Sequence, residues 1–96
     1  MITLAALEGA YAQNTVKAYE RDVQKFASWC EVRGYSCLPS TTGIVLEFVE
    51  ICGRDCLART VRRNLIAVGM LHRLNGFSDP TTGEDVSLAL RRLARA

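Results

Sequence analysis

Residues 59–75 read RTVRRNLIAVGMLHRLN, and this stretch decides the fold. An α-helix turns by about 100° per residue, so a helix through this stretch gathers its apolar side chains on one side. The apolar stripe begins at Val61, and Leu65, Val68 and His72 all fall within about 40° of it, with Leu71 near the edge. The pattern predicts a helix that packs against a hydrophobic core.

The opposite side of the same helix is basic. It carries Arg59, Arg63, Ile66 and Met70, with Arg62 and Arg73 on its flank. No acidic residue occurs between Asp55 and Asp79. A helix that enters a DNA groove needs guanidinium groups for phosphates and guanine edges, and apolar groups for thymine methyls. The alternative is an ordinary solvated face, but a purely solubilising face would avoid exposing two apolar side chains.

A second basic helix precedes the first. Asn14 or Thr15 is expected to cap a helix that runs to about Arg33, and Gly34 is expected to end it. Its core stripe is Val16, Tyr19, Val23, Phe26 and Cys30, and its opposite or flanking side carries Lys17, Arg21, Lys25 and Ser28. We expect the basic faces of the two helices to lie on one continuous surface.

Two shorter helices complete the expected fold. After a loop over 36–40, Ser40, Thr41 or Thr42 caps a helix that ends near Cys52. The apolar residues expected in that helix are Ile44, Leu46, Phe48, Val49 and Ile51. The last helix runs from Glu84 to about Arg95, with Val86, Leu90 and Leu93 inward. Its predicted capping box pairs Thr81 with Glu84 or Thr82 with Asp85.

The composition indicates one small all-α domain. The chain has 96 residues, is 49% hydrophobic and carries a net charge of +2, and no alternating strand pattern occurs in it. We expect a compact bundle of four main helices, plus a possible short N-terminal helix. Residues 1–13 would form an arm or that short helix, and residues 14–96 the domain itself. The residues expected to be mostly buried are Val16, Tyr19, Val23, Phe26, Val61, Leu65, Val68, Leu90 and Leu93.

The cysteines do not have the spacing of a zinc site. Cys30, Cys37, Cys52 and Cys56 contain no CxxC pair, and the one histidine lies on an apolar stripe. The first residues lack the basic region of a signal peptide, which favours reduced thiols in the cytoplasm. No apolar run approaches transmembrane length. We therefore expect no metal, no cofactor and no membrane partner.

Three segments resemble a known family when they are taken together. They are NTVKAYERDVQKFASWCEVRGY at 14–35, ARTVRRNLIAVGMLHRLNGFSDPT at 58–81 and VSLALRRLAR at 86–95. Their order, spacing and helical phase resemble the N-terminal core-binding domain of tyrosine recombinases, or phage integrases, which has a SAM-like fold. The resemblance covers about residues 14–96, nearly the whole chain.

The resemblance implies a domain that clamps one face of a recombination site while a separate catalytic domain clamps the other. Its partners would be double-stranded DNA, through the major groove and the phosphates, the catalytic domain of the same parent chain, and other recombinase protomers on the DNA. It would be cytoplasmic and nucleoid-associated, and encoded by a bacterium or a phage. The implied DNA contacts are Thr15, Lys17 and Arg21 from one helix and Arg59, Thr60, Arg63 and Ala67 from the other. The basic faces add Lys25 and Arg62.

The family's catalytic groups are not expected in this chain. His72 is followed by Arg73, Leu74 and Asn75, which does not fit the family's H-x-x-R motif. His72 is better interpreted as a residue at the edge of the core. We therefore expect that this chain is not an enzyme by itself and that the catalytic domain is absent from it. The alternative function is a helical protein–protein interaction module whose arginine-rich face contacts an acidic partner.

Overall fold

The computed structural model describes residue 4, residue 7 and residues 9–95. It contains four helices: α1 (Gln13–Arg33), α2 (Thr42–Cys52), α3 (Ala58–Leu74) and α4 (Glu84–Arg95). The described residues form no strand. The predicted all-α fold of four main helices is therefore confirmed.

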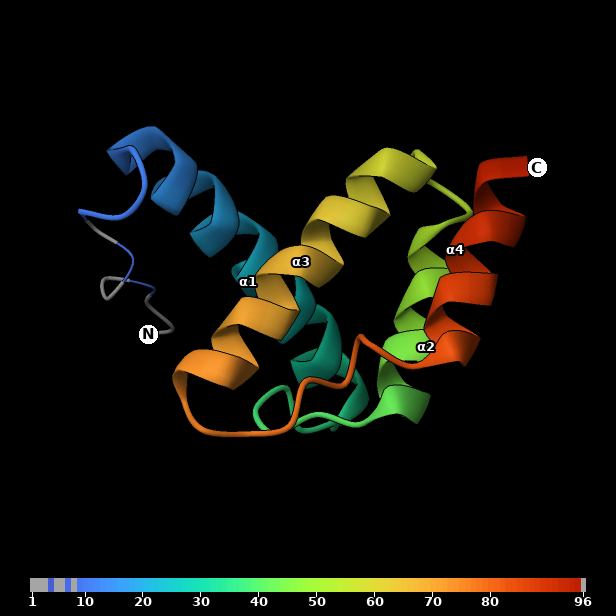
Figure 1. The fold of residues 1–96 in the computed structure, drawn as a ribbon. Helices are drawn as coiled ribbons and strands as arrows, with labels where there is room; N and C mark the ends of the chain where they lie inside the picture. Colours follow the sequence, from blue (N-terminus) through green and yellow to red (C-terminus); the bar gives the residue numbers. More distant parts are fainter. Residues whose placement is uncertain (1–3, 5–6, 8, 96) are drawn as a thin grey trace.

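The helices form two pairs (Figure 1). The long helices α1 and α3 cross and make the most extensive contact between any two helices, and α2 packs mainly on α4. The molecule measures 37 × 26 × 24 Å along its principal axes. In Figure 1, α1 and α3 begin on the upper side and α4 ends there, so these three helix ends lie toward the same side.

Local sequence signals set several of the helix ends. Gly34 ends α1 in the left-handed region with φ of 73°, where a side chain would be strained. The hydroxyl of Thr41, one of the three residues predicted as the cap, accepts a hydrogen bond from the backbone N–H of Ile44 at the start of α2. The predicted cap of α1 is wrong, because Ala12 occupies the cap position and Asn14 and Thr15 lie in the first turn.

The capping box predicted for α4 is also wrong. The hydroxyls of Thr81 and Thr82 donate hydrogen bonds to the side chain and the carbonyl of Asp79, respectively. At the start of α4, the carbonyl of Gly83 accepts the backbone N–H groups of Val86 and Ser87. The threonines stabilise the turn that precedes the helix, and they do not cap it.

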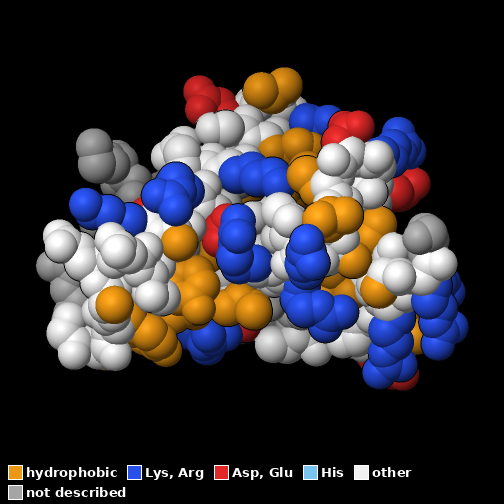
Figure 2. All heavy atoms as spheres, turned by 90° about the horizontal axis from the view of Figure 1, so that it is seen from above, with side chains coloured by type: hydrophobic (Ala, Val, Ile, Leu, Met, Phe, Trp, Pro, Cys, Tyr) orange, Lys and Arg blue, Asp and Glu red, His pale blue; other side chains and the backbone are white. Residues whose placement is uncertain are grey.

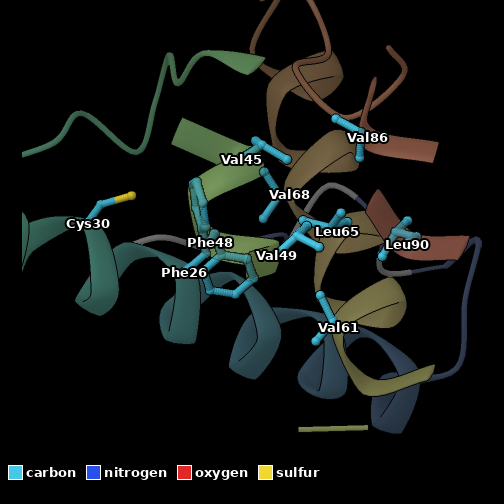
Figure 3. Close-up of a cluster of buried hydrophobic side chains, with 10 residues drawn as sticks. All are labelled: Phe26, Cys30, Val45, Phe48, Val49, Val61, Leu65, Val68, Val86 and Leu90. Carbon is cyan, nitrogen blue, oxygen red and sulfur yellow. The ribbon is translucent and has the colours of Figure 1, made fainter. Parts of the chain in front are cut away.

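The main core lies where all four helices meet (Figure 3). The rings of Phe26 and Phe48 pack edge to face at its centre, with centroids 5.1 Å apart. The cluster consists of Phe26, Cys30, Val45, Phe48, Val49, Val61, Leu65, Val68, Val86 and Leu90. Val45 is fully buried, although it was not among the apolar residues named for this helix, whereas Ile44 and Leu46 are only partly buried.

A second core cluster lies between the first half of α1 and the second half of α3. It consists of Leu4, Leu7, Val16, Val23, Ala67, Met70 and Leu71. The predicted short helix over 1–13 lies partly outside the described residues, but Leu4 and Leu7 are buried in this cluster. The division of the chain at residue 13 stays a prediction, and α1 itself begins at Gln13.

Most of the predicted core is confirmed. Seven of the nine residues named above are buried, and Tyr19 and Leu93 are half-buried. Met70, which the helical phase placed on the exposed side of α3, is only 9% exposed. That prediction is wrong because the second cluster covers this part of α3.

His72 is part of the interior. Its side chain is 0% exposed, and its Nε2 accepts the backbone N–H of Ser40 at 2.8 Å. Its Nδ1 lies 2.8 Å from the carbonyl oxygen of Val68. The imidazole therefore ties α3 to the loop before α2, which is a structural role. No described helix is long and apolar enough to cross a membrane.

Candidate nucleic-acid interface

Five exposed cations lie in the halves with which α1 and α3 begin. Lys17 and Arg21 of α1 are exposed, as are Arg59, Arg62 and Arg63 of α3. Figure 2 views the molecule from the side on which both helices begin and α4 ends. Lys and Arg side chains recur across this face, with hydrophobic side chains between them. We refer to Lys17, Arg21, Arg59, Arg62 and Arg63 together as the basic surface.

A bidentate ion pair joins the two helices at this surface. The Nε and Nη2 atoms of Arg63 donate to the two carboxylate oxygens of Asp22 at 3.0 and 3.1 Å. Asp22 directly follows Arg21, so this ion pair brings Arg63 against α1 one residue along the chain from Arg21. The side chain of Asp22 is only 4% exposed, whereas that of Arg63 is 57% exposed. The hydrogen bonds and the negative charge of Asp22 raise the pKa of the Arg63 guanidinium, which keeps it charged.

The ion pair continues inward as a chain of hydrogen bonds. The amide Nδ2 of Asn64 donates to Asp22 at 2.8 Å, and Asn64 is fully buried. Lys25 donates from Nζ to Oδ1 of Asn64 at 2.9 Å and lies 3.4 Å from the sulfur of Cys56. Lys25 is half-buried, and these two contacts already engage its ammonium group inside the protein. The sequence pattern placed Lys25 on the basic face and did not identify Asp22 or Asn64.

A signal for this network was present in the sequence. Asp22 directly precedes the core residue Val23, and Asn64 directly precedes Leu65. Polar residues that border a core stripe on two long helices are expected to be hydrogen-bonded when the helices pack together. The pairing itself joins residues 41 and 42 positions apart, which helical periodicity does not reveal.

Three other predicted contacts differ in their accessibility. Ala67 is 0% exposed in the second core cluster, so this structure offers no surface there for DNA. Thr15 and Thr60 are half-buried. Ile66, in contrast, is 48% exposed beside the arginines of α3, as its helical phase predicted.

The remaining cations divide into paired and unpaired groups. Arg73 pairs with Asp79 near the end of α3, Arg54 pairs with Glu50 of α2 at 3.7 Å, and the Arg33 guanidinium lies 4.3 Å from the centre of the Trp29 ring. Within the described residues, no ion pair engages Lys17, Arg21, Arg59 or Arg62. The exposed residues Arg91, Arg92 and Arg95 of α4 add positive charge where that helix ends.

The backbone adds to the positive potential of the same side. Neither α1 nor α3 has an acidic residue in its first turn or a side-chain cap at its N-terminus. The N–H groups that begin a helix carry a partial positive charge and attract anions. A hollow lined partly by Arg59, Arg62 and Leu93 lies between the start of α3 and the end of α4.

Among the described residues, we find no cluster of metal-ligating side chains, and the pKa values of two thiols and one phenol are raised. No group of three His, Cys, Asp or Glu side chains gathers in the described part of the chain. Burial raises the pKa of the Cys30 thiol to about 11, with a smaller contribution from Cys37, and burial also raises the pKa of Cys52. The hydroxyl of Tyr35 donates to Glu47 at 2.8 Å, which raises the pKa of that phenol. Each of these groups therefore stays protonated at neutral pH.

Comparison with known proteins gives a consistent assignment. The sequence model of the family described as phage integrase, N-terminal SAM-like domain, matches residues 4–74. The integrase/recombinase xerD homolog of Selenomonas ruminantium is 35% identical over 72 residues, which is 75% of this chain and 21% of that protein. Recombinase cre of Escherichia phage P1 is 25% identical over 87 residues, which is 90% of this chain and 25% of that protein. The chain thus spans about a fifth to a quarter of the length of these relatives.

Proposed function

The chain belongs to the phage integrase N-terminal SAM-like domain family, and from this membership we propose that it binds duplex DNA as part of a site-specific tyrosine recombinase. In this proposal the domain clamps one face of the recombination site through the major groove and the phosphates. A catalytic domain of the same parent chain holds the other face and carries out strand cleavage and exchange. Other recombinase protomers on the same DNA are its further partners, in the cytoplasm of a bacterium.

The observation that carries the proposal is the basic surface. Lys17 and Arg21 of α1 and Arg59, Arg62 and Arg63 of α3 are all exposed. The hydrogen bond from Arg63 to Asp22 joins the two helices at this surface. Two crossing helices with adjoining basic faces form a positively charged surface that suits the phosphates along a DNA groove. The uncapped helix starts on the same side favour phosphate groups.

The residues of the surface have different roles in this proposal. Lys17, Arg21, Arg59 and Arg62 have no ion-pair partner among the described residues, which suits contacts with phosphates. Arg63 is held in place by Asp22, which suits a contact with a base edge. Thr15 and Thr60 are half-buried and would add contacts at the border of the surface. Ala67 is not proposed as a DNA contact because it is buried. Lys25 contributes mainly by stabilising the fold, through its hydrogen bond to Asn64.

The test is a titration of a fluorescently labelled duplex with the 96-residue chain at two salt concentrations. We expect affinity to fall steeply with added salt, because each cation that neutralises a phosphate releases a counterion. The variant Arg62→Ala should bind more weakly than the wild type. Arg54→Ala is the matched control, since Arg54 is an exposed arginine of the turn after α2 that pairs with Glu50. We also expect no strand cleavage by this chain alone.

Two results would contradict the proposal. One is binding that does not depend on salt, and the other is no binding even at low salt. Either result would favour the alternative function, in which the arginine-rich face contacts an acidic protein partner.

A further inference from the structure

We propose that Arg63 contacts a guanine edge in the major groove and that Asp22 is the positioning residue that presents the Arg63 guanidinium to it. This inference rests on the proposed function and adds a specific reading contact to it. It assigns a role to a nearly buried carboxylate at a surface that is otherwise basic.

The geometry of the pair leaves the correct edge of the guanidinium unoccupied. A guanidinium group has five N–H donors, and Asp22 engages Nε and Nη2 along one edge. The end of the group retains both N–H donors of Nη1 and one N–H donor of Nη2. Two of these donors point outward in parallel, which is the arrangement that matches O6 and N7 of guanine. The side chain of Arg63 is 57% exposed, so this end is accessible from outside.

The carboxylate of Asp22 is itself held firmly. It lies 4% exposed between α1 and α3 and accepts a hydrogen bond from the buried Asn64 at 2.8 Å. Lys25 in turn donates to Asn64, so the orientation of that amide is fixed as well. A long arginine side chain normally loses considerable rotamer freedom when it binds a base. Because Asp22 has already restricted Arg63, less of this entropy remains to be lost on binding.

The charge of Asp22 supports the same role. A carboxylate in this position weakens the attraction of Arg63 for phosphates, because it neutralises the guanidinium at a distance of 3.0 Å. It therefore lowers the affinity for DNA of any sequence. What remains is a directional interaction, which is worth most at a base edge with two matching acceptors. The pair thus exchanges general affinity for discrimination between bases.

The experiment selects bound duplexes from a pool with randomised sequence and sequences them. The wild-type chain should enrich a motif with one position at which guanine is preferred roughly tenfold or more. Arg63→Ala should lose the preference at that position and keep the rest of the motif. Asp22→Asn removes the charge and keeps the shape, so it should reduce the same preference while binding to unselected DNA stays equal or becomes tighter.

Two further variants separate positioning from folding. Arg63→Lys keeps the positive charge but lacks the fork, so it should lose the guanine preference with little change in affinity for unselected DNA. This variant tests the inference even if Asp22→Asn proves unstable. Lys17→Ala should lower affinity for all sequences and leave the motif unchanged.

The outcomes distinguish this inference from the proposed function. A purely structural role for Asp22 predicts that Asp22→Asn lowers the melting temperature and leaves the guanine preference intact, which would overturn the inference. Salt-dependent binding by the wild type without any guanine that depends on Arg63 would also overturn it, and DNA binding would stand. Absence of salt-dependent binding by the wild type would instead reject the proposed function.

Discussion

Single cations on the basic surface differ in how firmly the protein holds them. Lys17 is exposed, and no ion pair within the described residues restricts it. Lys25 is one helical turn beyond Arg21, yet its ammonium group donates to Asn64. A mobile cation suits the phosphate backbone, which offers negative charge at any register. A cation that is already hydrogen-bonded inside the protein has less to gain from DNA.

This difference gives a prediction for two lysines of the same helix. Lys17→Ala should weaken binding to all duplexes and reduce the salt dependence by about one phosphate contact. Lys25→Ala should have the smaller effect on affinity and the larger effect on stability, because it leaves the Asn64 carbonyl oxygen without its donor. Duplex titrations at several salt concentrations and urea unfolding of both variants measure the two effects. If Lys25→Ala gave the larger loss of affinity, Lys25 would belong to the DNA-binding surface.

At the level of elements, Asp79 organises the connection from α3 to α4. Its Oδ1 accepts the backbone N–H of Thr81 at 2.8 Å and the hydroxyl of Thr81 at 2.6 Å, and its carboxylate also pairs with Arg73. Burial alone would raise the pKa of Asp79, but these hydrogen bonds and the charge of Arg73 outweigh it and lower the pKa. The ionised carboxylate is therefore the form that the fold stabilises.

The lowered pKa of Asp79 predicts an acid dependence of stability. A carboxyl whose pKa is lower in the folded state contributes its full stabilisation above the unfolded-state value of about 3.9. That contribution is lost as the pH falls through the folded-state pKa. Asp79→Asn should therefore be less stable than the wild type near neutral pH, and the difference should shrink below about pH 4. Urea unfolding across this range measures it, and a constant difference at every pH would show that Asp79 is not the group responsible.

Gly69 allows the same connection to approach α3 closely. A Cβ atom at this position would lie 2.6 Å from Oδ2 of Asp79 and 3.0 Å from the hydroxyl oxygen of Thr81. Both neighbours are already fixed by their hydrogen bonds to each other. Alanine at this position would therefore displace the turn from the helix.

We expect Gly69→Ala to lower the melting temperature even though alanine favours helices by about 1 kcal/mol over glycine. Gly43→Ala is the matched control within α2, because a Cβ atom at that position would have its nearest neighbour 3.9 Å away. That control should be neutral or stabilising. A thermal melt of the two variants decides the matter, and an equal stabilisation of both would mean that the turn yields easily.

For the whole molecule, stability depends on the cluster that joins both helix pairs. Leu65 of α3 is 3% exposed and lies among residues of α1, α2 and α4 (Figure 3). A small domain is stabilised by only about 5–15 kcal/mol in total. The loss of one central side chain therefore affects all four helices together.

Leu65→Ala should lower the free energy of unfolding by roughly 2–5 kcal/mol, through lost burial and the cavity that remains. Ile66→Ala is the control, since the adjacent Ile66 is 48% exposed and should cost far less. Chemical denaturation followed by helical circular dichroism measures both. Similar losses for the two variants would mean that the helical phase of α3 is wrong.

The sequence alone determined the helices and the phase of their core sides. Spacing of apolar residues and the end at Gly34 are local signals, so the bounds of α1 and α3 were predicted to within about two residues. The same spacing identified Val61, Leu65 and Val68 as core residues of α3 and Arg59, Arg62 and Arg63 as exposed. Helical phase depends only on residues a few positions apart, which the sequence displays directly.

The tertiary structure decided how much of each helix is covered and which charges are paired. Met70 became buried because Leu4, Leu7 and α1 pack on a part of α3 that helical phase assigns to the outside. The same cluster buries Ala67, which only the family resemblance had placed at the DNA. Arg63 and Asp22 met because α1 and α3 cross at these two positions. A helical pattern specifies the direction of each side chain, whereas burial and ion pairing depend on which distant segments pack against it.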